Sequence, residues 1–263
     1  MKFVVRTGIT SFVLLVLEAG RHINWQEVAS ALLVCVVLCW MAERSHAAGV
    51  ELVIALGGFY FILVSLTTIP EGVLFDVIKI GQAPPLMVVQ LGIGLAIAIT
   101  IAALFEKFSG TAGAIQTSVV GMTVVGLLWR MAAAIVVFLV CYFGAGMLIF
   151  PMVKDFYQGR NMPGIVAIVA MVTLRVVCLL VATWLAVRRI PNRRDARLIL
   201  TTAFPVIGIF SLMLHRNEMM PPAVRWVHTI ETAPYYALCG FLFAVWFGPQ
   251  GQGKKPAQEG NWE

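Results

Sequence analysis

Long apolar runs separated by short polar segments dominate the sequence. The runs that are long enough to span a membrane cover roughly residues 3–20, 25–42, 48–69, 84–105, 130–151, 163–187, 197–215 and 231–248. A helix rises about 1.5 Å per residue, so about 20 apolar residues cross the ~30 Å hydrocarbon core of a bilayer. The pattern predicts an all-α fold, a polytopic transmembrane helix bundle of about eight spans.

Two stretches leave the number of spans open. The first run ends early, at Glu18, and its charged start at Met1–Arg6 resembles a signal peptide. Because no small-x-small cleavage site follows cleanly, we expect an uncleaved anchor helix. Residues Ala112–Leu128 are also apolar. They form either a ninth span or a re-entrant or interfacial segment that leads into the next run.

Positive charges favour eight spans over nine. With eight spans and a cytoplasmic N-terminus, most Lys and Arg residues, including the Arg188–Arg197 cluster, fall in inner loops. A ninth span would move that cluster outside, against the tendency of cytoplasmic loops to carry the excess of Lys and Arg. We therefore expect one transmembrane domain over residues 1–248 and a disordered cytoplasmic tail over residues 249–263.

Composition agrees with a membrane protein. The chain is 60% hydrophobic and 12% charged, whereas a soluble domain has about 25% charged residues. This excludes a soluble enzyme, a disordered chain and a disulfide-rich module, and the cysteines in apolar runs predict free thiols. The net charge of +6 reflects loop residues rather than nucleic-acid binding, and membrane lipids are the expected partners. No P-loop, GxGxxG or GxSxG motif is present.

Arg175 is the most unusual polar residue. It lies in the middle of the Gly164–Val187 run, about 17 Å from either end by helical rise. Charged groups in hydrocarbon cost about 2.5–3.5 kcal/mol each and are usually paired. Arg175 therefore forms either a structural ion pair between two helices or part of a substrate or anion site, unless the boundaries of its span are shifted.

Glu71 follows Pro70 at the outer end of the third predicted span. A proline there interrupts the helix and frees carbonyl groups near the carboxylate. The simpler interpretation is an interfacial glutamate in water. The alternative is an inward-facing acid that pairs with Arg175 or holds a cation.

Pro221 and Pro222 predict a helix start that places Arg225, His228 and Glu231 along neighbouring faces. His228 and Glu231, one turn apart, can ligate a metal or act as an oriented general base. HxxE supplies only two ligands, so Glu71 or His215 would have to complete a metal site. The alternative is the wet polar face of an amphipathic helix start.

The chain also resembles, over roughly residues 25–248, an uncharacterised family of bacterial polytopic integral membrane proteins. The likeness rests on a series of short segments: Arg44–His46, Ile69–Phe75, Trp129–Arg130, Tyr142–Gly144, Phe150–Pro151, Phe156–Tyr157, Leu174–Arg175 and Val224–Arg225 with His228 and Glu231. It implies a bacterial cytoplasmic (inner) membrane and six characteristic polar positions, Glu71, Arg130, Arg175, Arg225, His228 and Glu231. It implies no activity and no cofactor.

Three functional classes are open from the sequence. A binding or transport protein would use Arg175, Glu71 and Glu231 to line a polar pocket for a small or lipid-like molecule, with a cavity that reaches Arg175. A membrane-embedded enzyme for lipid or lipid-linked substrates would use His228 and Glu231 as metal ligands or as an acid–base pair. Arg130 or Arg225 would then bind phosphate. In a structural or assembly protein, the ion pairs would only hold helices together.

Overall fold

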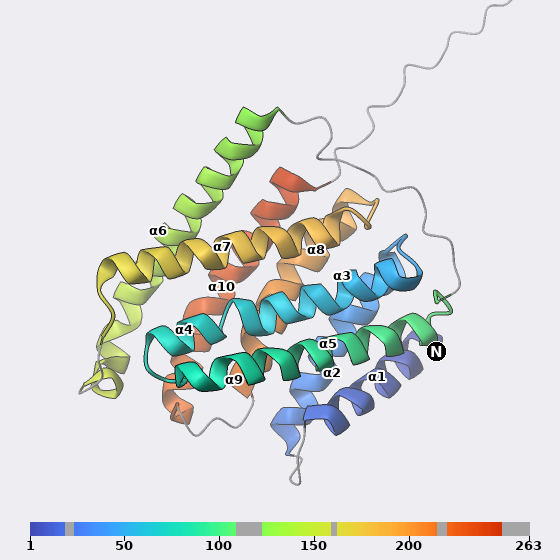
Figure 1. The fold of residues 1–263 in the computed structure, drawn as a ribbon, viewed down its shortest axis with the longest axis horizontal. Helices are drawn as coiled ribbons and strands as arrows, with labels where there is room; N and C mark the ends of the chain where they lie inside the picture. The colour runs from blue at the N-terminus through green and yellow to red at the C-terminus, as the bar shows by residue number, and fades with distance from the viewer. Residues whose placement is uncertain (19–23, 109–122, 159–161, 215–219, 249–263) are drawn as a thin grey trace, which may run out of the picture.

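The computed structural model describes residues 1–18, 24–108, 123–158, 162–214 and 220–248. These residues form a bundle of helices and include no strand (Figure 1). Seven of the described helices are long and apolar enough to cross a membrane. The protein is therefore an all-α helical bundle with the composition of a membrane protein.

The bundle contains regular helices and short irregular ones. In chain order these are α1 (Lys2–Glu18), α2 (Trp25–Arg44), α3 (Gly49–Phe61), η1 (Ile62–Leu66), α4 (Ile69–Leu74), η2 (Ile80–Gln82), α5 (Ala83–Leu104), α6 (Val124–Tyr157), α7 (Ile165–Val187), α8 (Arg193–Pro205), η3 (Val206–Phe210), α9 (Ser211–Leu214) and α10 (Pro222–Phe247). η1 and η3 are π-helical turns, and η2 is a 3₁₀ turn. Helices α3 and α8 thus each continue through a π turn into a short helix.

The predicted runs and the observed helices differ most at α6 and α10. Helix α6 extends from Val124 to Tyr157, because the residues before Arg130 are also apolar and continue the helix. Helix α10 begins at Pro222 and so includes the whole segment with Arg225 and His228. Helix α1 has 17 residues, at the short end of the ~17–25 that a span requires. Residues 112–122 and the tail at 249–263 lie outside the described residues.

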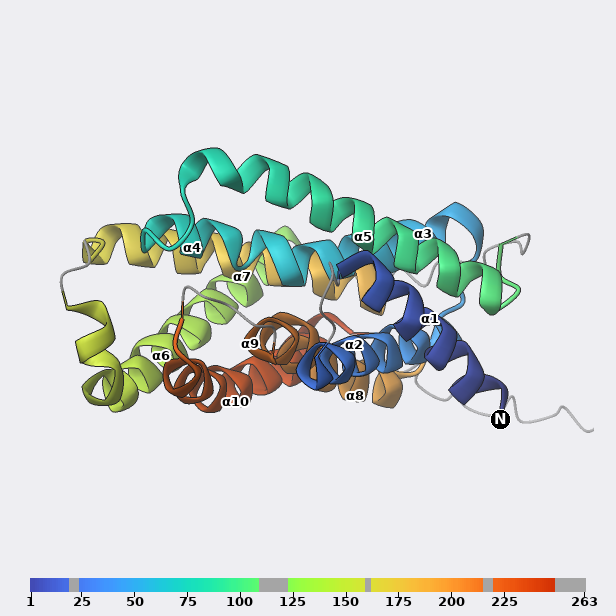
Figure 2. The same cartoon turned by 90° about the horizontal axis from the view of Figure 1, so that it is seen from below.

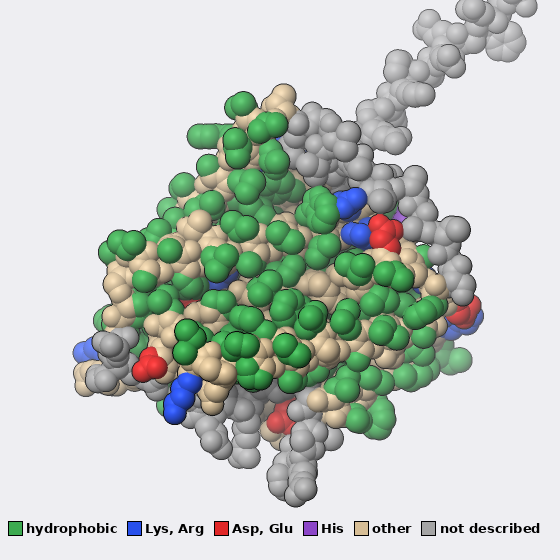
Figure 3. All heavy atoms as spheres, in the orientation of Figure 1, with side chains coloured by type: hydrophobic (Ala, Val, Ile, Leu, Met, Phe, Trp, Pro, Cys, Tyr) green, Lys and Arg blue, Asp and Glu red, His purple; other side chains and the backbone are tan. Residues whose placement is uncertain are grey.

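Two sides of the bundle can be followed in Figure 2. Helices α3, α5 and α7 lie on one side, and α2, α8, α9 and α10 on the other. Helix α6 runs obliquely along α7 and α10, and α1 packs on α2 and α5. On the face seen in Figure 3, hydrophobic side chains cover most of the middle and charged ones lie mainly toward the edge. This is the surface that contact with lipid tails requires.

Close backbone contacts hold these layers together. At Gly240, an added Cβ would lie 2.3 Å from the carbonyl oxygen of Leu200, so α10 and α8 touch through their backbones. At Gly94, an added Cβ would lie 3.1 Å from the carbonyl oxygen of Gly57, where α5 crosses α3. Small residues at helix crossings are the usual means of tight packing in membranes, where lipid supplies no hydrophobic driving force.

Ion pairs gather at one end of the bundle, which we call the charged end. Its described members are Arg6, Arg44, Glu51, Glu106, Lys107, Arg189 and Asp195. The pairs are Arg6–Glu106 at 3.5 Å, Arg44–Asp195 at 3.3 Å and Arg189–Glu51 at 3.0 Å. They bring the starts of α1, α3 and α8 next to the ends of α5, α7 and α2, so the helices alternate in direction.

Candidate functional site

Arg175 forms an ion pair with Glu71. The arginine lies in the middle of α7, and its side chain is only 4% exposed. Its Nη2 pairs with Oε2 of Glu71, and its Nε donates a hydrogen bond to the carbonyl oxygen of Thr67 at 3.0 Å. The helix-joining ion pair, one of the alternatives drawn from the sequence, is therefore present.

The irregular backbone around Pro70 brings Glu71 to Arg175. The π turn η1 ends at Leu66, and α4 restarts at Ile69 with Pro70 in its first turn. Just before this restart, the Thr67 hydroxyl donates to the Leu63 carbonyl at 2.7 Å. The Thr67 carbonyl oxygen accepts a hydrogen bond from the Arg175 side chain, which belongs to another helix. The interrupted helix thus supplies both a carboxylate and a backbone acceptor to one guanidinium.

A tyrosine from α6 forms a hydrogen bond with Glu71. The Tyr142 hydroxyl donates to Oε1 of Glu71 at 3.4 Å, on the carboxylate oxygen that does not pair with Arg175. The Glu71 side chain is nevertheless 30% exposed. Its carboxylate is held in place but still accessible.

His228 and Glu231 form a second polar group on α10. Nδ1 of His228 lies 2.9 Å from Oε2 of Glu231, and Nε2 of His228 lies 3.1 Å from the Tyr157 hydroxyl. The Thr232 hydroxyl donates to the His228 carbonyl at 2.5 Å. The imidazole is thus held between a carboxylate and a phenol, and both α10 side chains are largely buried.

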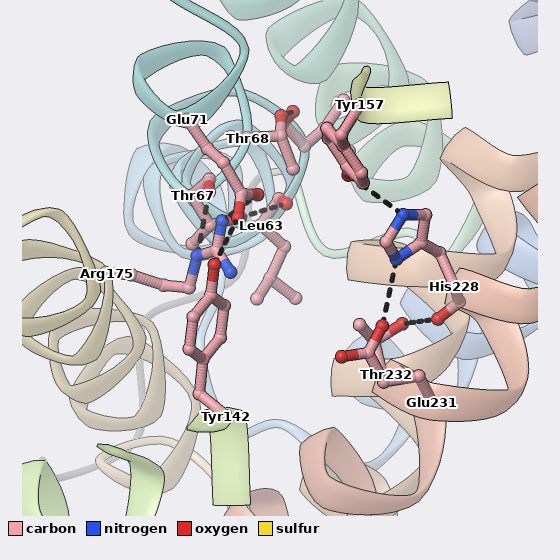
Figure 4. Close-up of polar contacts among 11 residues, drawn as sticks. Leu63, Thr67, Thr68, Glu71, Tyr142, Tyr157, Arg175, His228, Glu231 and Thr232 are labelled. Atoms are coloured by element: carbon pink, nitrogen blue, oxygen red, sulfur yellow. Dashed lines mark hydrogen bonds and ion pairs between the residues drawn. The ribbon is translucent and has the colours of Figure 1, made fainter. Parts of the chain in front are cut away.

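The two groups face each other inside the bundle, as Figure 4 shows for the labelled side chains. Helix α6 contributes to both groups, because Tyr142 bonds to Glu71 and Tyr157 bonds to His228. We call Glu71, Tyr142, Tyr157, Arg175, His228 and Glu231 the intramembrane polar cluster. Its members come from α4, α6, α7 and α10.

Two of the six sequence-derived positions lie elsewhere. Nη1 of Arg130 donates to the carbonyl oxygen of Trp246, close to the end of α10. Nη1 of Arg225 donates to the carbonyl oxygen of Met213 in α9 at 3.4 Å. Both arginines thus bind backbone carbonyls and connect helices. Tyr142 and Tyr157 lie in segments of the family resemblance, but they were not among the six polar positions predicted from the sequence.

A metal site at His228 and Glu231 gains no third ligand within the described part of the chain. No group of three or more His, Cys, Asp and Glu side chains is arranged there to hold an ion. Glu71, one suggested third ligand, pairs with Arg175 instead. His215, the other, lies outside the described residues.

A cavity of about 350 Å³ lies apart from the intramembrane polar cluster, and we call it the Gln90 cavity. Its lining residues are Leu17, Ser30, Val34, Tyr60, Val64, Val89, Gln90, Ile93, Ser211 and Leu212. Arg175 is not among them. The sequence analysis expected a cavity that reaches Arg175, and the Gln90 cavity does not reach it.

Comparison of the chain with protein-family models, curated proteins and solved structures found no match. The resemblance to an uncharacterised bacterial family stays a prediction. Any functional conclusion depends on the geometry of the two polar groups.

Proposed function

We propose that the protein is an integral protein of a bacterial inner membrane that binds or transports a small or lipid-like molecule at the intramembrane polar cluster. The observation that carries this proposal is the convergence of two acid-containing groups from four helices inside an otherwise apolar bundle. Inserting each charge costs about 2.5–3.5 kcal/mol, and such residues usually mark substrate, ion or proton paths.

The charges within the cluster favour a cationic group or a proton as part of the bound species. Arg175 balances Glu71, to which it is directly paired. Glu231 faces His228, which carries a charge only when protonated. With neutral His228, these four residues hold one net negative charge. A proton on His228 or a cationic ligand group near Glu231 would balance it.

We further propose eight spans with both ends of the described chain on the cytoplasmic side. Gly208 faces Tyr236 and Gly240 faces Leu200, so η3 with α8 runs antiparallel to α10. The end of α10 therefore lies near the start of α8, at the charged end where α1 also begins. A reporter that is active only in the cytoplasm, fused after Phe247, is expected to be active. An inactive reporter would contradict this arrangement.

The binding proposal can be tested by identifying small molecules that copurify with the protein. Wild type, Glu231→Gln and His228→Asn would be purified in the same detergent, extracted and compared by mass spectrometry. At least one compound should be abundant in wild type and depleted by about tenfold in both variants, which corresponds to about 1.4 kcal/mol of binding free energy.

Glu106→Gln is the matched control, because it removes a carboxylate at the charged end, where Glu106 is largely exposed. The control should retain the compound. Identical extracts from all four proteins, each monodisperse in detergent, would contradict a binding function of the cluster.

One observation favours a second candidate, a membrane-embedded enzyme for lipid or lipid-linked substrates. Tyr157, His228 and Glu231 form a hydrogen-bonded series in which a carboxylate orients an imidazole, as in general-base sites. Elemental analysis of the wild type and of the His228→Ala, Glu231→Ala double variant tests whether such an enzyme would depend on a metal. A stoichiometric transition metal that the double variant loses would favour a metalloenzyme, and equal metal content in both would contradict a metal-dependent enzyme.

A further inference from the structure

The Gln90 cavity has the lining of a binding site for an uncharged amphiphile. Most of its described lining residues are apolar, and none of these described residues carries a formal charge. The polar ones are Ser30, Tyr60, Gln90 and Ser211. A charged ligand buried against the described walls would lose hydration without gaining a counter-ion from them, which is unfavourable. An apolar chain with one neutral polar group avoids that loss.

The orientation of Gln90 defines the polar group that the cavity accepts. The Tyr60 hydroxyl donates to Oε1 of Gln90 at 3.2 Å, and this bond directs the amide oxygen toward Tyr60. The amide NH₂ of Gln90 is then a donor for another acceptor. Elsewhere in the lining, the Ser30 hydroxyl donates to the Ser211 carbonyl at 3.1 Å. A ligand carbonyl or ester oxygen is the natural partner of the Gln90 amide.

Two π-helical turns shape the wall of the cavity. Val64 belongs to η1, and Ser211 and Leu212 directly follow η3. The hydroxyl of Ser211 donates to the Ile207 carbonyl and so satisfies one acceptor in η3. Single π turns within helices recur at functional sites because they displace side chains from the regular helical positions. Here both η1 and η3 border the Gln90 cavity.

The mouth of the cavity lies beside the lipid-facing surface of α5. Val89 lines the cavity and is 56% exposed, and Leu17 at the end of α1 is also exposed. Because these rim residues are apolar, a ligand can enter from the surrounding lipid. The volume of about 350 Å³ lies near the lower end of the ~300–1,000 Å³ range of small-molecule sites.

We propose that the Gln90 cavity binds a neutral glyceride-like lipid, with an ester carbonyl accepting a hydrogen bond from the Gln90 amide and acyl carbons against Val34, Val64 and Ile93. This site is separate from the intramembrane polar cluster and does not depend on the function proposed for it. The proposal follows from the uncharged lining, the oriented amide and the apolar rim.

Photo-crosslinking in phospholipid vesicles tests the proposal. The probes would be a monoacylglycerol with a diazirine in its acyl chain and the free fatty acid with the same chain. Mass spectrometry of peptides should place the glyceride label on lining residues of α2, η1 and α5. At a pH at which the acid is ionised, the fatty acid should label these residues about tenfold less, because its carboxylate gains no counter-ion from the described lining.

Three variants on α5 sharpen the test. Val89→Trp blocks the mouth and should reduce glyceride labelling to the level of the lipid-exposed surface. Val88→Trp is the matched control, because Val88 is 70% exposed and does not line the cavity. Gln90→Leu should lower labelling by about tenfold, as expected for one lost hydrogen bond of about 1.4 kcal/mol. Equal labelling of Val88→Trp and Val89→Trp, or equal labelling by ester and carboxylate, would overturn the proposal.

Discussion

The charged end and the intramembrane polar cluster both join distant helices by ion pairs, but two of the three described pairs at the charged end are much more exposed than the pair in the cluster. At the charged end, the side chains of Arg44 and Glu106 are 51% and 85% exposed. In the cluster, Arg175 is 4% exposed. Exposed pairs contribute about 0–1 kcal/mol, whereas removing one partner of a buried pair costs about 3–5 kcal/mol. The contribution of an ion pair to stability therefore depends on how deeply it is buried, not on how many pairs there are.

Lys107 gives the charged end a stronger connection than its ion pairs do. Its Nζ donates to the Ala42 carbonyl at 2.6 Å and to the Ser45 carbonyl, and so caps the end of α2. Burial lowers the pKa of the Lys107 ammonium, while the negative charge of Glu43 acts to raise it. Hydrogen bonds from a cation to backbone carbonyls thus hold α2 against the end of α5.

The largest effect that we expect is from Glu71→Ala. This change leaves the Arg175 guanidinium buried without its carboxylate, at a cost of about 3–5 kcal/mol. Thermal unfolding in detergent should show a large fall in Tm. The double variant Glu71→Leu, Arg175→Leu should recover most of this loss, because no unpaired charge remains. A Glu71→Ala protein as stable as Arg44→Ala would contradict the comparison.

Lys107→Met should have the next largest effect. Methionine keeps an apolar chain of similar length but removes the donor to the Ala42 and Ser45 carbonyls. We expect a loss of about 2 kcal/mol, within the range for hydrogen bonds to charged groups. Hydrogen exchange should show the loss at the end of α2 and leave α7 unchanged. Faster exchange in α7 instead would show that the two regions are coupled.

Glu51→Ala should destabilise the protein by about 1 kcal/mol. Its partner Arg189 is partly buried and also donates to the Leu185 carbonyl at 3.2 Å, so the arginine keeps one acceptor when the carboxylate is removed. Tm in detergent measures this change, with Glu43→Ala as a control for loss of a nearby charge. A loss of stability as large as that of Glu71→Ala would show that the Glu51–Arg189 pair behaves as a buried ion pair.

Arg44→Ala should have the smallest effect, about 0.5 kcal/mol or less, because Arg44 is half exposed in its pair with Asp195. The difference from wild type should disappear in high salt, since salt screens exposed charges. The effect of Glu71→Ala should persist under the same conditions. A salt-independent effect of Arg44→Ala would mean that this pair is shielded from solvent.

Local features of the fold could be read from the sequence. The apolar runs predicted helices near the observed positions, because hydropathy and the length of a span depend on contiguous residues. The two prolines predicted the start of α10, and the spacing of His228 and Glu231 predicted that these side chains could meet. Each of these properties is decided within one or two helical turns.

Only the tertiary structure decided which helices supply each partner. Glu71 and Glu231 were both available to Arg175, and packing of α4 on α7 selected Glu71, more than a hundred residues away in the chain. The roles of Tyr142 and Tyr157 and the Gln90 cavity likewise depend on contacts between helices. Hydropathy identifies residues that avoid water, but lipid and protein are almost equally apolar. Shape and backbone contact therefore decide the pairing of helices, and a single sequence does not display them.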